Sequence, residues 1–250
     1  MLRRLYLAYL EVIRRLCLAI ENSDGESEKL LMMIKKCAHP ESRILDVGCG
    51  YGRKLDLLLS AGYANTTGVE INAAIVKHNK EHGLPCVTVD EFNRSEDKYD
   101  IILMSHVIEH FSPSDLLIFM DDYLDHLVSG GHLVIATPLM SSYFYDDFDH
   151  VKPYQPAGIS AVFGVDKAQV QYYSKNKLIL KDLWFRKSAY RMSFVRGKYI
   201  NTPRNKYTNM LAALLFPLPT LLSGFVFFLS NGFLSKTDGW VGVFQKVAKQ

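Results

Sequence analysis

The feature that most constrains the fold of this chain is an apolar run that ends in a glycine-rich turn, at residues 44–52. Ile44, Leu45 and Val47 predict a buried strand. Glycine then stands at three alternate positions, which are Gly48, Gly50 and Gly52. Because glycine has no Cβ and tolerates positive φ, such a turn lets backbone N–H groups and a helix N-terminus approach a ligand closely. The sequence therefore predicts a strand, a tight turn and a helix around a ligand.

The spacing of these glycines distinguishes two kinds of nucleotide-binding turn. The dinucleotide fingerprint G-x-G-x-x-G, counted from Gly48, needs its third glycine where Arg53 stands, so a nicotinamide site fits poorly. The sequence instead reads D-x-G-x-G-x-G from Asp46, and Glu70 ends the next apolar run 20 residues after Gly50. This combination resembles the class I S-adenosylmethionine-dependent methyltransferases of the small-molecule type.

The resemblance implies S-adenosyl-L-methionine as cofactor and names the residues that hold it. In that family the glycine turn packs against the methionine part, and the acid that ends the second strand holds the ribose hydroxyls. Phe92 or a neighbour would cover the adenine, and Asp90 or Glu91 would accept from its amino group. The expected cofactor-binding residues are Asp46, Gly48, Cys49, Gly50, Tyr51, Gly52, Glu70, Ile71, Asp90, Glu91, Phe92, Ser105 and His106.

Strand and helix patterns alternate along the middle of the chain. Apolar runs predict strands at 44–47, 66–70, 86–89, 99–104 and 133–136. Helical patterns lie between them at 53–60, 73–81 and 114–128. Later strands at 177–186 and 239–247 match the antiparallel edge hairpin of the resembled family. We expect an α/β fold, a Rossmann-like doubly wound sheet of seven strands, mostly parallel, with helices on both faces and a helical insertion between the last two strands.

The loop after the fourth strand, residues 105–111, resembles that of the ubiquinone-pathway O-methyltransferases. Its His106-x-x-Glu109-His110 also fits the H-x-x-E-H pattern of zinc peptidases, but it follows a strand directly and runs into a Ser-Pro helix start, so we expect no zinc. For a hydroxyl acceptor the candidate catalytic bases are His106, His110 and His150. A structural hydrogen-bonding role is the alternative for each of them.

The segment after the fifth strand is rich in polar and aromatic residues and predicts a substrate wall. Its candidate substrate-binding residues are Tyr143, Tyr145 and Tyr154. Acidic residues at 146, 147 and 149 stand beside His150, but closely spaced acids in a loop are commonly just solvated. We therefore expect no metal site.

The net charge of +3 conceals a division along the chain. Residues 1–166 carry 15 Lys and Arg against 24 Asp and Glu, whereas residues 167–250 carry 14 against 2. Residues 209–234 carry no charge at all, and Pro217 and Pro219 suit two short helices or a re-entrant hairpin better than one straight membrane crossing. We expect an anionic membrane surface as a partner through residues 167–234, with a solvated basic face and buried helices as the alternative.

These observations give one expected organisation and one expected function. Residues 1–40 form a helical cap, 41–186 and 236–250 the cofactor-binding core, and 187–235 the insertion. The four cysteines show no C-x-x-C spacing, which favours a reducing cytoplasm, with the protein peripheral at the inner face of a membrane. The expected activity is methyl transfer to a small-molecule, lipid-linked or glycan acceptor, at oxygen. The alternatives are an RNA methyltransferase that uses the basic face at 167–206, although nucleic acid is a disfavoured partner, and a non-catalytic cofactor-binding protein.

Overall fold

The computed structural model describes residues 25–141, 144–165, 169–190 and 217–247, with a few isolated positions near the N-terminus. The chain divides into two compact units. The larger holds Glu26–Phe185 and Gly239–Gln250, and the smaller holds Met1–Gly25 and Arg186–Asp238. The predicted N-terminal helix lies almost wholly outside the described residues, and the three-part division at residues 40, 186 and 235 stays a prediction.

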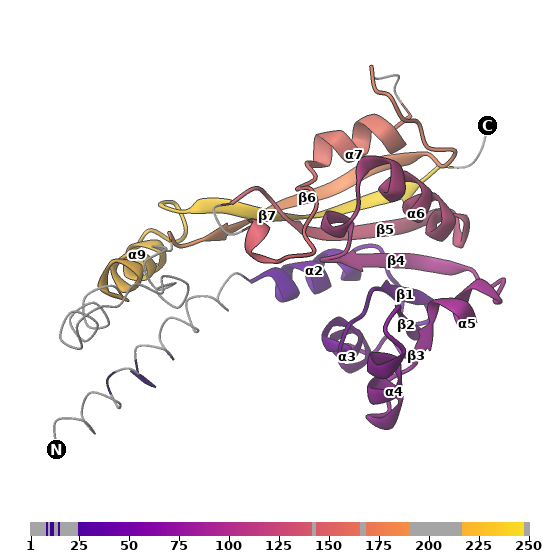
Figure 1. The fold of residues 1–250 in the computed structure, drawn as a ribbon, viewed down its shortest axis with the longest axis horizontal. Helices are drawn as coiled ribbons and strands as arrows, with labels where there is room; N and C mark the ends of the chain where they lie inside the picture. The colour runs from indigo at the N-terminus through magenta and orange to yellow at the C-terminus, as the bar shows by residue number, and fades with distance from the viewer. Residues whose placement is uncertain are drawn as a thin grey trace. The chain divides into compact units, whose positions relative to one another are not determined.

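A seven-stranded sheet organises the larger unit (Figure 1). Its strands are β1 (Ile44–Val47), β2 (Thr66–Glu70), β3 (Cys86–Thr88), β4 (Tyr99–Ser105), β5 (Leu127–Pro138), β6 (Leu178–Ser188) and β7 (Lys236–Lys246). Their order is β3-β2-β1-β4-β5-β7-β6. The first five strands pair in parallel, and β7 runs antiparallel to β5, with Ala136 opposite Val241. The predicted Rossmann-like sheet is confirmed.

Helices cover both faces of this sheet, as the alternation of patterns predicts (Figure 1). In the larger unit they are α2 (Glu26–Lys35), α3 (Arg53–Ser60), α4 (Ala73–Glu81), α5 (Val89–Asn93), α6 (Pro113–Asp125) and α7 (Pro156–Phe163), with short 3-10 turns at Ile108–His110 and Phe144–Asp146. Side chains of α5, α6 and α7 pack with Ile102 and Met104 of β4. Those of α2 and α3 pack with Ile101 and Leu103 on the opposite face. The period-2 alternation of β4 thus separates two apolar cores.

Several element boundaries differ from the expected ones, at the ends of β3, β4, β5, β6, β7 and α6. The strand expected to reach Val89 ends at Thr88, because a capping box with Glu91 begins α5 there. The helix expected to reach Val128 ends at Asp125, and β5 begins at Leu127, since the His126 carbonyl already accepts from the Tyr99 N–H of β4. Helix α7 was not predicted at all.

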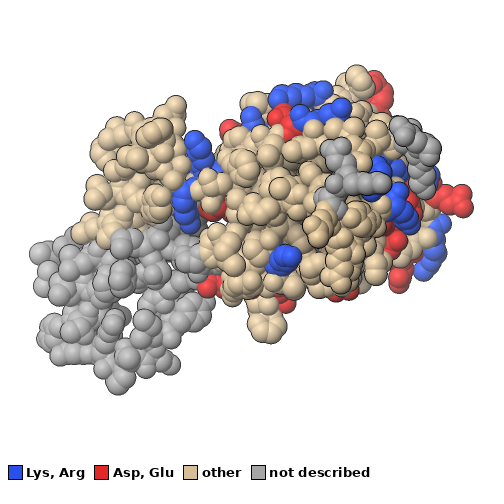
Figure 2. Space-filling view, turned by 90° about the horizontal axis from the view of Figure 1, so that it is seen from above, with Lys and Arg blue, Asp and Glu red and all other residues tan. Residues whose placement is uncertain are grey.

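The smaller unit contains the ends of β6 and β7 and the apolar helix α9 (Pro217–Leu229). Arg186 pairs with Asp238 across the two strand ends, with 2.9 Å between Nε and Oδ1. Much of α9 is exposed although it is apolar: Leu222 is 64% exposed and Phe225 60%. In Figure 2 this segment, at the left of the view, presents uncharged, tan atoms. Within the described ranges, no helix combines the length and the apolar character that a membrane span requires.

Candidate active site

The glycine turn after β1 forms one wall of the candidate site. Gly48, Gly50 and Gly52 all have positive φ, at 67°, 51° and 77°. A Cβ on Gly48 would lie 2.7 Å from Cγ2 of Val107, so the turn and the loop after β4 approach more closely than any side chain at 48 allows. Gly48 and Val107 both line the cavity described below.

Glu70, the last residue of β2, is tied to this turn by its carboxylate. Its Oε2 accepts a hydrogen bond from the Gly50 N–H at 3.0 Å, and its Oε1 accepts from the Asn72 N–H at 2.9 Å. Each carboxylate oxygen has further acceptor capacity after these bonds. Glu70 is therefore held rigidly and can still accept from two neighbouring hydroxyl groups of a ligand.

Asp46 lies inside β1, directly before the turn, and its side chain is buried. Its Oδ2 has no hydrogen-bond partner among the described residues. Burial raises the pKa of Asp46 to about 7, and the positive charge of Lys54 opposes that rise only in part. A buried carboxyl group in this state is stabilised by any cation or hydrogen-bond donor that a ligand places next to it.

Asn79 supports the turn from behind, and nothing in the sequence analysis singled it out. It is fully buried on α4, and its Nδ2 donates to the Gly50 carbonyl at 2.7 Å. Next to it the thiols of Cys49 and Cys86 lie 3.4 Å apart, and a Cβ on Gly68 would come within 2.7 Å of Cys49 Sγ. Cys49 therefore packs against the sheet, away from the ligand side of the turn.

A cavity of about 630 Å³ opens beside the turn, entirely within the larger unit. Of the expected cofactor-binding residues it is lined by Gly48, Glu70, Ile71, Phe92 and His106. The candidate base His110 also lines it. Sequence reasoning predicted a wall from the loop after β5, which contributes Asp149, but it missed α6 and part of α5. The missed lining residues of these helices and their ends are Val89, Asn93, Phe119, Asp122, Tyr123 and His126. The capping box that begins α5 was the one signal that could have revealed part of this wall.

Several expected cofactor residues do not line this cavity. Tyr51 is 69% exposed and packs its ring edge-to-face on His78. Asp90 is exposed, and Glu91 forms the capping box and pairs with Lys80. Ser105 ends β4 with a buried hydroxyl oxygen that has no partner among the described side chains and backbone groups. Of the predicted adenine contacts, only Phe92 faces the cavity.

His106 lies between two carboxylates in a strained backbone conformation, with φ 58°. Its Nε2 is 3.0 Å from Oε1 of Glu26, and its Nδ1 is 3.3 Å from Oε1 of Glu109. Desolvation lowers the pKa of His106, but the contacts with Glu109 and Glu26 outweigh it and raise that pKa to about 9. His106 therefore carries its proton at neutral pH, and this geometry disfavours it as a catalytic base.

The three tyrosines expected at the substrate have different surroundings. Tyr143 lies outside the described residues. Tyr145 is exposed and packs edge-to-face on Phe144. Tyr154 is buried, and its hydroxyl donates to the Phe111 carbonyl at 3.0 Å, while its own carbonyl accepts from Trp240. Tyr154 thus joins the loop after β4 to β7, and a role in substrate binding stays a prediction.

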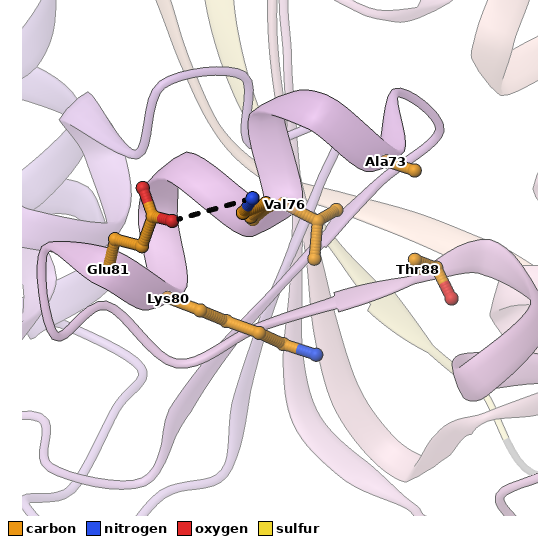
Figure 3. A pocket seen from close by; sticks show the side chains of 6 residues that line it. Ala73, Val76, Lys80, Glu81 and Thr88 are labelled. Atoms are coloured by element: carbon orange, nitrogen blue, oxygen red, sulfur yellow. Dashed lines mark ion pairs between the residues drawn. The ribbon is translucent and has the colours of Figure 1, made fainter.

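A second, open groove lies along α4 and β3 and is shown in Figure 3. Lys80, Glu81 and Thr88 line it, together with Ala73, Val76 and Lys77. The dashed line in the figure marks the ion pair between Lys77 and Glu81, whose Nζ and Oε1 are 3.9 Å apart. Because none of these six residues lines the larger cavity, this groove is separate from the candidate site.

Comparison with known proteins identifies what this arrangement is. A family described as the methyltransferase domain matches residues 6–198 of the chain. The chain belongs to this family. The match contains the glycine turn, Glu70 and the loop after β4, so the cavity of this methyltransferase is formed by residues within it.

Individual relatives agree with this assignment. The ubiquinone biosynthesis O-methyltransferase of Chelativorans sp. is 30% identical over 103 residues, and this match spans 38% of the chain and 40% of the relative. A SAM-dependent methyltransferase of Archaeoglobus fulgidus has the same fold, with a TM-score of 0.54 and 18% identity over 91% of this chain and 96% of that one. The YcgJ protein of Bacillus subtilis also has this fold, with a TM-score of 0.55 and 17% sequence identity; the match covers 89% of this chain and 99% of that one.

The methyltransferase uses S-adenosyl-L-methionine, and the residues of the cavity fit this cofactor. Glu70 offers two fixed acceptor oxygens of the kind that ribose hydroxyls need. The buried carboxyl group of Asp46 suits a positively charged amino group nearby, and Gly48 lines the cavity without a side chain of its own. The chain is therefore a SAM-dependent methyltransferase, and the cavity beside the glycine turn is the candidate site for its cofactor.

Proposed function

We propose that this methyltransferase methylates a hydroxyl oxygen of a small-molecule, lipid-linked or glycan acceptor. The observation that supports this most is the composition of the cavity beyond the cofactor residues, where His110 and Asp149 stand beside the aromatic rings of Phe111 and Phe119. Aromatic rings suit the body of an organic acceptor, and the polar pair suits its hydroxyl group. The similar O-methyltransferase from Chelativorans supports oxygen as the methylated atom.

The protein's part in this reaction is mainly alignment. When bound, S-adenosylmethionine supplies a methyl group made electrophilic by its sulfonium. Glu70 and Gly48 line the cavity and would hold the cofactor, and the rings of Phe111 and Phe119, which also line it, would exclude water from the acceptor. His106 is already protonated and cannot accept the hydroxyl proton. His110 and Asp149, which line the same cavity, are therefore the groups that would accept it.

We also propose that α9 brings the enzyme to an anionic bilayer, where a lipid-linked acceptor would be found. Leu218, Leu222, Phe225 and Leu229 follow the helical repeat on the exposed surface of α9. The segment is uncharged, and the chain before it is basic. An apolar helix face with adjacent positive charge is the pattern of a helix that lies in a membrane interface.

The acceptor experiment uses an extract and radiolabelled S-adenosylmethionine. We expect label in an organic-soluble or glycan fraction, with a methyl ether in the isolated product, and we expect Glu70→Ala to abolish the signal. Label in RNA, or in nitrogen-linked methyl groups, would contradict the proposal. Cofactor binding by the wild-type chain without any labelled product would favour the non-catalytic alternative.

The membrane experiment compares vesicles with and without anionic lipid. We expect the full chain to co-sediment with vesicles that contain phosphatidylglycerol, and the double variant Leu222→Asp, Phe225→Asp to stay in solution. Ile118→Asp is the matched control, because Ile118 is an equally exposed apolar residue on α6. Equal sedimentation of both variants, or no preference for anionic vesicles, would overturn this part of the proposal.

A further inference from the structure

Three side chains of metal-binding type converge beside the cavity from two segments far apart in the sequence. They are Glu109 and His110, in the loop after β4, and His150, in the loop after β5. One ligand atom from each lies within 4.8 Å of the other two. The two loops are joined by the Glu109 carbonyl, which accepts from the N–H groups of Val151 at 2.8 Å and Lys152 at 3.1 Å. The backbone therefore fixes this cluster.

Each histidine already uses one ring nitrogen to bond a backbone carbonyl. His110 Nδ1 lies 3.1 Å from the carbonyl oxygen of Asp149, and His150 Nδ1 lies 2.7 Å from that of Phe144. A carbonyl only accepts hydrogen bonds, so both Nδ1 atoms are the protonated ones, and both Nε2 atoms carry lone pairs. A backbone carbonyl that orients the far nitrogen is the usual support of a metal-binding histidine.

Glu109 is the carboxylate of this cluster. Its side chain is fully buried, and Oε2 accepts from Thr137 Oγ1 at 3.0 Å. Oε1 makes no well-aligned hydrogen bond within the described chain, and it forms an ion pair with the protonated His106, whose Nδ1 lies 3.3 Å away. A carboxylate oxygen can accept more than one partner, so Oε1 keeps acceptor capacity toward a bound ion.

We propose that Glu109, His110 and His150 bind a divalent transition-metal ion such as Zn²⁺ or Mn²⁺. Two imidazoles and one carboxylate form a donor set that leaves coordination positions open for water or substrate. His110 lines the cavity, so an open position would face the acceptor end. This inference rests on the proposed function in one respect: an acceptor hydroxyl on the ion would lose its proton more readily. It replaces the expectation that this chain holds no metal.

The test measures metal binding directly, without turnover. Full-length protein is stripped with a chelator and dialysed against Zn²⁺ or Mn²⁺, and bound metal is counted by mass spectrometry. We expect one ion per chain, and an affinity lower by about 10- to 100-fold in Glu109→Gln and in His150→Gln. Binding of S-adenosylmethionine by the same variants, expected to be unchanged, shows that they are folded.

A matched control separates this site from incidental binding by exposed histidines. His78 and His82 lie side by side at the C-terminal end of α4, with tilted rings whose centroids are 4.1 Å apart, and the pair can hold metal adventitiously. Replacing both with alanine should leave the stoichiometric ion in place. No stoichiometric binding, unchanged binding in both Gln variants, or loss of the ion in the α4 variant would each overturn the proposal. Metal binding without a methylated hydroxyl product would instead refute the proposed function alone.

Discussion

Asp46 shows how burial at one residue can set the pH response of a binding site. The carboxyl group is buried in β1, and its pKa of about 7 lies well above the ordinary 3.8. At neutral pH the protein therefore carries this group as a mixture of its acid and its carboxylate. A ligand that brings a positive charge favours the carboxylate, so ligand binding and proton release are linked.

We expect the affinity for S-adenosylmethionine to fall as the pH is lowered through 7, by up to about tenfold per pH unit below the pKa of Asp46. The reason is that the acid form cannot balance the charge of the cofactor's amino group. Isothermal titration at pH 5.5, 7 and 8.5 measures this directly. Asp46→Asn should bind weakly at all three values, and a wild-type affinity independent of pH would contradict the argument.

The stability of the ligand-free protein should respond in the opposite sense. The pKa of Asp46 is higher in the folded protein than in the unfolded chain. The contribution of this carboxyl group to the free energy of unfolding is therefore fully present below the pKa of the unfolded chain, and it is lost as the pH rises through about 7. The free energy of unfolding of the wild type should therefore fall, relative to Asp46→Asn, between pH 5 and pH 8. Urea titrations of the two proteins measure this difference.

At the scale of elements, a buried polar cluster fixes the second half of α6 to the chain before β6. Asp121 accepts from Ser174 Oγ and from Asn176 Nδ2, the latter at 3.0 Å. Ser174 and Asn176 are themselves buried. The cluster therefore positions the helix that contributes Asp122, Tyr123 and His126 to the cavity.

Asp121→Ala should lower the free energy of unfolding by about 2–4 kcal/mol, because it removes the acceptor of the buried Ser174 hydroxyl and one of the acceptors of Asn176 Nδ2. Tryptophan fluorescence in urea reports this change, since Trp184 and Trp240 both lie in the larger unit. Asp122→Ala, at the exposed neighbouring position, is the control and should change stability by less than about 0.5 kcal/mol. Equal effects of the two variants would rule out the cluster as a stabilising contact.

Sequence patterns predicted best the elements that have a clear hydrophobic periodicity or a residue, such as glycine, that clearly ends them. Strand β1 and helix α3 follow from the apolar run and the glycines at 48–52, and their bounds were predicted correctly. Helix α7 was missed because its eight residues, from Pro156 to Phe163, are apolar on nearly every side and show no amphipathic period. Its burial against the sheet, rather than local preference, makes it helical.

Only those parts of the candidate site that lie at the ends of predicted strands could be predicted from the sequence. Gly48, Glu70 and Phe92 each follow a strand, and the carboxyl ends of parallel strands share one edge of a sheet. The approach of His150 to Glu109 depends on backbone bonds between loops 40 residues apart, and no periodicity contains that information. Likewise, nothing local shows that Glu26 of α2 reaches His106.

At the scale of the whole molecule, the cofactor should stabilise one unit and not the other. All residues of the cavity belong to the larger unit. S-adenosylmethionine at 100 times its dissociation constant should add about 2.7 kcal/mol to the free energy of unfolding of that unit. Thermal unfolding followed by tryptophan fluorescence should show the shift. Glu70→Ala should remove most of it, the exposed control Glu41→Ala should keep it, and a shift that persists in Glu70→Ala would contradict the role of that carboxylate.

The contact between Gly68 and Cys49 can be tested with a double-mutant cycle. Gly68→Ala should destabilise the protein by about 1–3 kcal/mol, because its Cβ would meet the sulfur of Cys49 at 2.7 Å. In a background that carries Cys49→Gly, the same change should cost clearly less. Additive effects in urea unfolding would mean that the strand absorbs the extra methyl group elsewhere.

That contact also constrains how this turn can evolve. Position 68 lies in the middle of β2 and position 49 in the glycine turn, yet the space between them holds only one side chain. A lineage that gains a side chain at 68 must first, or at once, lose the one at 49. In an alignment of close relatives the two positions should therefore covary, with glycine alternating between them, even though neither residue lines the cavity.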